Sequence, residues 1–369
     1  MAVPERLLAA VVSVFVVAIV LWDAFETVVL PRTVTRRLRV TRFYFGFSWG
    51  GWSWLAGRIR SESRRERFLA IYGPLSLVAL AAVWAVGLIV GFAGLHWAAG
   101  SHLRPLGGAP ALDDLYMSGT TFFTLGLGDV QPIGRAARLV TVAEAGTGFA
   151  FLATVVAYFP VLYQSFSHRE AQLTLLDAWA GSPPAGAEVL RRLAARGELD
   201  LLQPFLKDWE YWCSAVLESH ISYPALAFFR SQHQRQSWVA AVAAILDLAA
   251  LVEVGIDRVP TWQAHATFAI ARHAAADLTQ VLRATPDAAT DRLPASALEA
   301  LRRQLEEAGL APRRSPDADA QLAELRRSYE PFICGLSREL MMPLPSWWHE
   351  APRRDNWETN QRRVADAHL

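Results

Sequence analysis

The sequence predicts an all-α membrane protein, with membrane-spanning helices in its first half and a helical soluble domain in its second. Composition is the first reason: 53% of the 369 residues are hydrophobic and the mean hydropathy is +0.19, whereas 19% are charged. Such a chain is too apolar for an ordinary soluble protein and too charged to lie wholly in lipid. Three apolar segments also reach the roughly 20 residues that a helix needs to cross a bilayer. After position 167, apolar residues recur with a helical period.

The first spanning helix is expected within residues 1–30. Its apolar run is similar to that of a signal peptide, but it is long and lacks a small-residue cleavage site, so we interpret it as a retained helix. Near its end, Asp23 and Glu26 lie three positions apart and therefore on one helical face. We expect them to pair with Arg32 or Arg36 at the membrane interface rather than to bind an ion.

Residues 31–67 form an arginine-rich segment, with about ten arginines and only two acidic residues. Because loops rich in Arg and Lys stay inside, we expect this segment to be cytoplasmic and the N-terminus to be outside. The second span (68–97) then returns outward and the third (138–166) runs inward, so that residues 168–369 form a cytosolic domain. This topology is that of a multi-pass protein of the plasma membrane.

Three tryptophans are interleaved with the arginines of this segment: Trp49, Trp52 and Trp54. They suit a helix that lies at the level of the lipid headgroups. An ordinary amphipathic connector explains them equally well, and both interpretations are kept.

The region after residue 167 contains several segments of helical periodicity. They are residues 187–195, 201–217, 238–256, 262–282 and 298–305. The segment 238–256 is nearly long enough to span a membrane, but the charges of Asp247 and Glu253 favour burial inside a helical domain. We expect residues 311–317, which contain prolines and arginines, to be an exposed linker.

The most informative segment lies between the second and third spans, where residues 118–132 read SGTTFFTLGLGDVQP. A dehydrated cation needs a replacement for its water shell, and closely stacked backbone carbonyls can supply one. That geometry requires positive φ angles, which glycine adopts at little cost, and Gly126 and Gly128 stand at alternate positions. The predicted ion-binding residues of this filter (124–129) are Thr124, Leu125, Gly126, Leu127, Gly128 and Asp129.

Each part of this filter has an expected role. Thr124 would contribute its carbonyl and hydroxyl to the innermost site, and the next carbonyls would form the sites above it. Asp129 would attract cations at the outer mouth. Residues 112–123 are expected to form a short pore helix that begins near Asp113 or Asp114 and directs the negative end of its dipole at the inner entrance.

Such a helix followed by extended backbone is costly in lipid and must be enclosed by protein, so that one loop per chain implies several subunits. Four polar residues are expected to support the pore helix: Ser118, Thr120, Thr121 and Glu144. Glu144 would accept hydrogen bonds from Thr120, Thr121 or nearby backbone amides. A protonated or water-exposed carboxyl with only a packing role is the alternative.

These residues resemble a known family. The motif TLGLGD, with Ser118 and Thr121 before it and Pro132 after it, is similar to the pore loop of potassium channels, whose usual filter is TVGYG. The resemblance extends through the outer helix and the inner helix. Residues 23–31 and 222–229 are also similar to a bacterial subgroup that has an extra leading helix.

The resemblance implies a potassium-channel-like pore module of outer helix, pore helix, filter and inner helix at residues 68–167, with an extra N-terminal transmembrane helix and a helical cytosolic domain. It further implies a homotetramer in membrane lipid, with permeant K⁺ in the filter as the bound metal ion and no cofactor. Leu127 departs from the family, because it replaces the aromatic residue that holds the filter at its width. A non-selective cation channel therefore stays open, as does a non-conducting membrane-anchored sensor or scaffold with a degenerate pore.

The inner helix contains candidates for a hinge and a gate. Gly146 and Gly148 resemble the glycine hinge of the family, although glycines in membrane helices also serve close packing. Pro160 would kink the helix by removing a backbone hydrogen bond. Val156, Pro160 and Tyr163 lie where an inner gate would narrow.

Other functions find little support in the sequence. The cytosolic region lacks a nucleotide-binding glycine motif and a closely spaced ligand set, so we expect neither an enzyme nor a structural metal site. The net charge of +1 argues against nucleic acid as a partner. We expect His220, His265 and His273 to be solvated or capped. The domain would assemble the tetramer, transmit a gating signal or bind an unknown cytosolic ligand or protein. A partner could bind through four tryptophans, or these residues could form the core instead: Trp209, Trp212, Trp347 and Trp348.

Overall fold

The computed structural model describes residues 3–30, 39–99, 110–233, 235–257, 259–349 and 355–356. Within these ranges the regular structure is helical, and the only pairing of β type is an isolated bridge between Ile256 and Pro312. The chain is thus an all-α membrane protein, as predicted. It divides into two compact units, Met1–Tyr163 and Gln164–Leu369.

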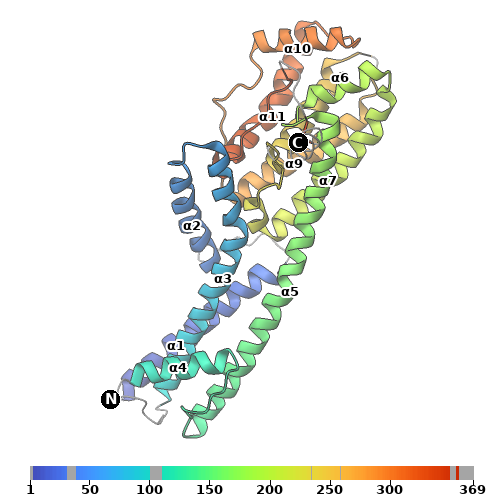
Figure 1. The fold of residues 1–369 in the computed structure, drawn as a ribbon. Coiled ribbons are helices and arrows are strands. Elements are labelled where there is room, and N and C mark those ends of the chain that lie inside the picture. Colours follow the sequence, from blue (N-terminus) through green and yellow to red (C-terminus); the bar gives the residue numbers. More distant parts are fainter. Residues whose placement is uncertain are drawn as a thin grey trace, which may run out of the picture. The chain divides into compact units, whose positions relative to one another are not determined.

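The N-terminal unit contains four helices and the first part of a fifth (Figure 1). They are α1 (Val3–Val28), α2 (Val40–Ala56), α3 (Glu62–Ala98), α4 (Pro110–Phe122) and α5 (Arg135–Ala180). Three of them, α1, α3 and α5, are long and apolar enough to cross a membrane, and only 17%, 44% and 17% of their most apolar windows is buried. Apolar side chains that remain uncovered to this extent require lipid or further protein around them.

Two spanning helices extend beyond the predicted spans. The outer helix α3 begins at Glu62, six residues before the predicted start, and the inner helix α5 continues to Ala180. The boundary between the two units lies inside α5, after Tyr163. The inner helix is therefore one continuous element that belongs to both units.

The leading helix α1 packs closely along α3. A Cβ atom at Gly91 would lie 2.6 Å from a methyl carbon of Val17, and one at Gly94 would lie 2.2 Å from the hydroxyl oxygen of Ser13. The two glycines thus allow the backbones to approach to a distance that any larger residue would prevent.

The inner end of α1 is tied to its neighbours through Asp23. Its carboxylate accepts hydrogen bonds from the indole of Trp84 on α3 (2.9 Å) and from the backbone amide of Thr41 on α2 (3.0 Å). The guanidinium of Arg39 lies 3.8 Å from Asp23 and 3.5 Å from Glu26. Arg39 is the arginine that pairs with these two carboxylates, whereas the expected Arg32 and Arg36 lie outside the described residues.

The tryptophans of α2 face in different directions. Trp52 stacks on Phe68 of α3 with ring centroids 4.4 Å apart, and the buried Trp49 meets Tyr72 edge-on at 4.8 Å. Trp54 is 59% exposed. Two of the three rings therefore hold α2 against α3, and only Trp54 is available to a membrane surface.

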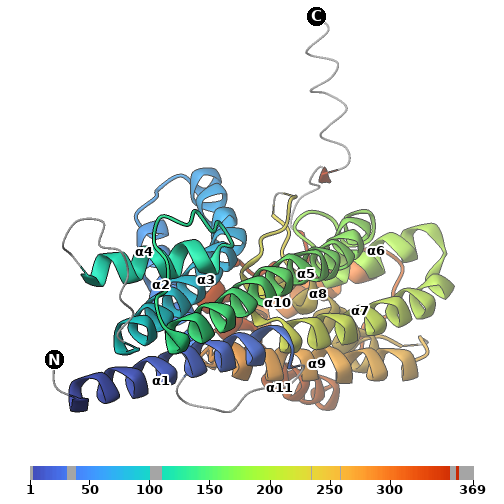
Figure 2. The same ribbon diagram turned by 90° about the horizontal axis from the view of Figure 1, so that it is seen from below.

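The C-terminal unit consists of the rest of α5 and the helices that follow it. They are α6 (Gly186–Arg196), a 3₁₀ turn (Leu199–Leu201), α7 (Leu202–Ser222), a second 3₁₀ turn (Pro224–Phe228), α8 (Trp238–Ala250), a π-helical turn (Leu251–Gly255), α9 (Trp262–Leu282), α10 (Ala295–Glu307) and α11 (Pro316–Leu340). α7 and α9 lie side by side (Figure 2). The helix α11 had no counterpart among the predicted segments.

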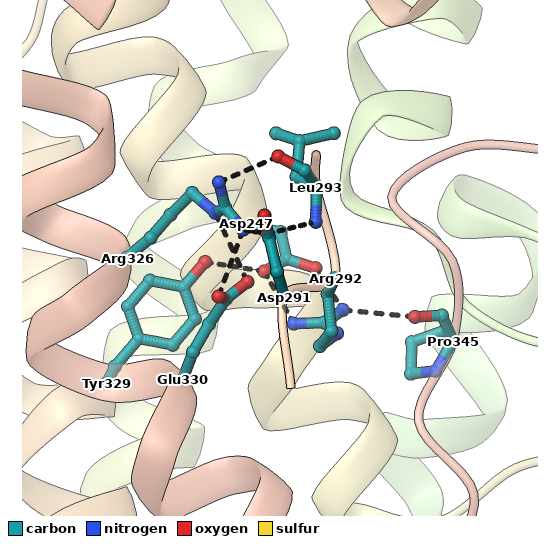
Figure 3. Close-up of polar contacts among 8 residues, drawn as sticks. All are labelled: Asp247, Asp291, Arg292, Leu293, Arg326, Tyr329, Glu330 and Pro345. Carbon is teal, nitrogen blue, oxygen red and sulfur yellow. Dashed lines mark hydrogen bonds and ion pairs between the residues drawn. The ribbon is translucent and has the colours of Figure 1, made fainter. Parts of the chain in front are cut away.

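The centre of this unit is α8, in which every side chain is buried. The segment Trp238–Gly255 is apolar enough to span a membrane, yet 89% of it is covered by the unit's other helices. The charge within α8, Asp247, is bound by Arg292 at 2.6 Å and by the hydroxyl of Tyr329 at 2.6 Å (Figure 3). A covered helix whose charge is neutralised by a partner forms the core of this helical unit.

Three of the four tryptophans considered in the sequence are core residues of this unit. Trp209, Trp212 and Trp347 are each at most 3% exposed, and Trp348 is partly buried against the same core. They therefore do not form an exposed binding surface, which was one of the two expectations for them.

Candidate functional site

The segment that follows α4 has an alternating backbone. Thr124, Gly126 and Gly128 have φ angles of +58°, +58° and +78°, whereas Leu125 and Leu127 between them do not have positive φ. In an ordinary extended strand, successive carbonyls point to opposite sides. A left-handed residue at every second position removes this alternation, so that successive carbonyls can be directed to one side.

The inner end of this segment is fixed to the pore helix. The backbone amide of Thr124 donates to the carbonyl of Thr121 (3.0 Å), and that of Leu125 donates to the carbonyl of Thr120 (2.8 Å). These bonds close the last turn of α4 and satisfy carbonyls that would otherwise lack a partner. The filter therefore starts directly from the C-terminal end of α4, where the helix dipole is negative.

The outer end is held by side chains. The hydroxyl of Tyr116, on α4, donates to Asp129 Oδ2 at 2.9 Å, and the other carboxylate oxygen accepts from the amide of Val130 at 3.0 Å. The amide of Gln131 donates to the carbonyl of Gly128 at 3.0 Å. Tyr116 was not among the predicted site residues, because its role depends on a contact with a residue after the filter.

The segment is uncovered in the single chain. Leu125 and Leu127 are 62% and 63% exposed, and Thr124, Gly126, Gly128 and Asp129 are exposed as well. Irregular backbone at membrane depth is tolerated only where protein or a water-filled cavity surrounds it. If this segment lies at membrane depth, residues 124–129 therefore need protein or a water-filled cavity around them.

Behind the filter, three buried polar residues connect the three helices of the pore region. The carboxylate of Glu144 on α5 accepts a short hydrogen bond from the hydroxyl of Ser118 on α4 and lies 3.0 Å from Nε2 of His96 on α3. All three side chains are fully buried. The group is thus a polar connection between the outer, pore and inner helices.

The contacts of Glu144 differ from the expected ones. Ser118 is among its partners, but Thr120 is not one, since its hydroxyl donates to the carbonyl of Met117 at 3.0 Å. Thr121 also makes no hydrogen bond to Glu144 among those that the structure defines. His96 was missed. Its signal in the sequence is a lone ionisable residue near the end of an apolar span.

The two glycines of the inner helix have different surroundings. A Cβ atom at Gly148 would lie 2.1 Å from the carbonyl oxygen of Phe122, at the end of α4, whereas one at Gly146 would meet nothing within 4 Å. Gly148 thus allows α5 to touch the end of the pore helix. Of the two roles considered for this residue, close packing has direct structural support.

The gate candidates lie on an uninterrupted helix. Pro160 is inside α5, which continues on both sides of it. Val156 and Tyr163 are 71% and 67% exposed, on a face that also carries the exposed Val142 and Phe149. An exposed apolar face of this kind is available to line a pore or to contact a second subunit, and the gate remains a prediction.

The described histidines outside the pore region have other partners or surroundings. In the described part of the chain there is no group of three or more His, Cys, Asp or Glu side chains that could hold an ion. His265 pairs with Glu253 and His273 with Asp277, both at the surface. His220 differs from the expectation, because its side chain is buried. Its Nε2 accepts a hydrogen bond from the guanidinium of Arg169 at 3.0 Å, and its Nδ1 donates to the Val216 carbonyl at 2.8 Å. Burial and the neighbouring guanidinium hold the pKa of His220 well below its usual range.

Comparison with known proteins agrees with this location of the site. Residues 80–164 match a family described as "Ion channel". The chain is also 26% identical over 221 residues to the uncharacterized membrane protein YdjJ of Bacillus subtilis, and the match covers 56% of this chain and 60% of that protein. No solved structure matches. The matched residues 80–164 include most of α3, all of α4, the alternating segment and α5 as far as Gln164, and the match supports an ion-channel pore in this region.

Proposed function

We propose that the chain forms a homotetrameric, potassium-selective channel in which dehydrated K⁺ passes the backbone carbonyls of residues 124–128. The observation that carries this proposal is the left-handed backbone at Thr124, Gly126 and Gly128, since a one-sided array of carbonyls is what replaces a cation's hydration shell. The match to an ion-channel family over the same region supports it.

The charges around the filter favour cations over anions. The C-terminal end of α4 directs its negative dipole at the inner entrance, and the exposed carboxylate of Asp129 stands at the other end. Both features attract cations and repel anions.

Enclosure supports the tetramer. The exposed residues 124–129 need protein around them, and each chain supplies a single segment of this kind. Four copies around one axis would cover the segment and complete the coordination of the ion, with the residues of each chain contributing a quarter of every site.

The orientation follows from charge. The arginine-rich segment before α3 is expected to stay in the cytoplasm. The N-terminus then lies outside and the C-terminal unit lies in the cytosol, with the channel in the plasma membrane. The abundant pairing of Arg with Asp and Glu at the surface of that unit, as at Glu299 and Arg314, is typical of a water-exposed helical domain around an apolar core. We propose no catalytic activity.

The test is ion flux through purified protein in lipid vesicles. We expect K⁺ flux, a bi-ionic reversal potential that favours K⁺ over Na⁺, and a native mass of four chains of 40.8 kDa. Gly126→Ala would abolish flux because alanine strains a φ of +58°. Gly119→Ala is the matched control, since a Cβ there meets nothing within 4 Å and φ is not positive.

Three results would contradict the proposal in different ways. Equal K⁺ and Na⁺ permeability would indicate a non-selective cation channel, the alternative suggested by Leu127 in place of an aromatic residue. Tetramers without flux would indicate a scaffold with a degenerate pore. A monomeric protein in lipid would exclude the pore itself.

A further inference from the structure

A cavity of about 430 Å³ lies in the C-terminal unit between α5 and α7. Its wall on the α5 side comprises residues 164–169, which follow directly after the gate candidate Tyr163, and the opposite wall is the last three turns of α7. Its volume is in the range of sites that hold small organic molecules, about 300–1,000 Å³. None of the roles described so far uses this cavity.

The cavity is not built for an anion. Its buried cation, Arg169, has every N–H group engaged: Nε and one Nη bind Glu170 at 3.0 Å, and the remaining donors bind His220 and the carbonyls of Leu226 and Phe229 at 2.8 to 3.0 Å. A guanidinium whose five donors are all in use has none left for a ligand. Its charge is also offset by the adjacent Glu170 carboxylate.

Besides the exposed His168, the cavity wall carries the carboxylate of Glu218. Glu218 is exposed, and the structure defines no hydrogen bond or ion pair for it among the described residues. The hydroxyl of Ser222 on the α7 wall and the side-chain amide oxygen of Gln164 on the α5 wall can accept hydrogen bonds. Acceptors grouped around an unpaired carboxylate favour a ligand that carries N–H donors and a positive charge.

The rest of the wall is apolar or aromatic. Trp212, Ala215 and Val216 line the cavity from α7, and the indole nitrogen of Trp212 is already bonded to the backbone carbonyl of Arg169 at 3.2 Å. These side chains offer hydrophobic contact and a ring surface rather than further hydrogen bonds. A purely inorganic cation would gain nothing from them.

We propose that this cavity binds a small organic cation, namely a protonated amine attached to an apolar or aromatic body. Glu218 pairs with the ammonium group, the neighbouring oxygens accept its other protons, and the apolar body packs against Trp212 and Val216. The site is formed entirely within the C-terminal unit and does not depend on the pore.

The position of the site gives it a route to the pore. Residues 164–169 belong to the same uninterrupted helix as Gly148, Val156 and Tyr163. A ligand that binds α5 more tightly in one orientation than in another shifts the population of that orientation. We therefore expect occupancy of the cavity to change ion flux, a second step that rests on the proposed function.

The binding step is tested without any flux measurement. Tryptamine, an aromatic body with a primary ammonium group, is titrated by calorimetry at pH 8 into the full-length protein in detergent. Tryptophol, which has a hydroxyl in place of the ammonium, is the neutral comparison. We expect tryptamine to bind, tryptophol to bind at least about tenfold more weakly, and Glu218→Gln to weaken tryptamine by a similar factor.

Asp208→Asn is the matched control, because it removes the same charge from an exposed position on the same helix, outside the cavity. It should leave tryptamine affinity unchanged. Equal binding of tryptamine and tryptophol, equal affinity in Glu218→Gln and wild type, or absence of tryptamine binding would overturn the site.

Flux in vesicles tests the second step. We expect tryptamine to change K⁺ flux in wild type and to lose this effect in Glu218→Gln at the same concentration, whereas pore block by the amine would persist in that variant. Flux that is insensitive to bound tryptamine would overturn the coupling. Binding that depends on Glu218 in a protein without any flux would refute the proposed function and leave the site intact.

Discussion

The hydroxyl of Tyr116 donates a hydrogen bond of 2.9 Å to Oδ2 of Asp129 and so ties the pore helix to the residue just beyond the filter. The filter therefore has a fixed attachment at each end: backbone bonds to the last turn of α4 at Thr124 and Leu125, and this side-chain bond at the outer mouth. Neither the Leu125 nor the Leu127 side chain can supply a hydrogen bond, since both are aliphatic.

Tyr116→Phe removes this bond while keeping the ring. We expect the outer mouth to become less rigid and the K⁺/Na⁺ permeability ratio to fall by roughly fivefold to tenfold, since a hydrogen bond to a charged group is among the stronger ones. The measurement is the bi-ionic reversal potential. Tyr211→Phe, an exposed tyrosine on α7, should leave the ratio unchanged. An unchanged ratio in Tyr116→Phe would show that the bond does not hold the filter.

The two glycines of the inner helix offer a matched pair of substitutions. Gly148→Ala places a Cβ 2.1 Å from the Phe122 carbonyl oxygen and should push α5 away from α4, at a cost of about 1–3 kcal/mol. Gly146→Ala meets nothing within 4 Å and should be tolerated. Flux and tetramer melting temperature are measured for both variants. If Gly146→Ala alone impaired opening, a hinge at Gly146 would be the better account.

The buried group of Glu144, Ser118 and His96 is expected to position the pore helix. Glu144→Ala removes the buried acceptor shared by the Ser118 hydroxyl, which keeps its bond to the Ile89 carbonyl (2.7 Å), and His96 Nε2, and the loss of such a buried bond costs about 1–3 kcal/mol. We expect a lower permeability ratio and a lower melting temperature. Glu144→Gln keeps an acceptor for Ser118 and should recover most of the selectivity. Thr147→Ala, nearby on the same helix and only half-buried, is the control. Selectivity that is lost equally in the Gln variant would argue for a role of the charge rather than of the bonds.

The core of the C-terminal unit depends on the pair of Asp247 and Arg292, which joins α8 to the loop before α10 (Figure 3). Arg292→Met leaves a fully buried carboxylate with only Tyr329 as a partner, and we expect a loss of about 3–5 kcal/mol in unfolding free energy. Arg314→Gln removes a surface arginine paired with Glu299 and should have no measurable effect. Thermal unfolding followed by circular dichroism compares them. Equal melting temperatures would mean that the buried pair is not required for the core.

His220 predicts how stability depends on pH. Its pKa in the folded protein lies well below 6.5, so that below pH 6.5 the unfolded chain binds a proton that the folded chain does not. The stabilisation from the neutral imidazole is therefore fully present above pH 6.5 and is lost as pH falls, by at most about 1.4 kcal/mol per pH unit. His220→Gln should reduce the decline in melting temperature between pH 7.5 and 5.5. Parallel pH profiles of the two proteins would contradict this.

The parts of the molecule that could be predicted from the sequence are those determined by local pattern. The spanning helices follow from long apolar runs, and burial of α8 follows from Asp247, whose charge would be costly in lipid. The left-handed backbone at Gly126 and Gly128 follows from the absence of a Cβ atom. In each case the physical cause lies within the segment itself.

The rest depends on contacts between distant segments. His96 and Glu144 are 48 residues apart in the sequence, and Arg169 and His220 are 51 apart, so no local pattern predicts either contact. Arg39 lies beside Asp23 because α2 packs against α1 and α3, a contact that no local pattern predicts. The helix α11 was missed since its first half is rich in charged residues and one proline, Pro331, interrupts the pattern inside it.

The alternating backbone of residues 124–128 has a consequence for genetics. Alanine at Gly126 is strained by its own φ angle of +58°, so the defect lies within the residue itself, in a segment that already holds Thr124 at φ +58°. Alanine at Gly148 collides with a neighbour, and a second mutation that moves the end of α4 can restore the fit. A selection for revertants should therefore return mainly changes at position 126 itself, but second-site suppressors near Phe122 for position 148.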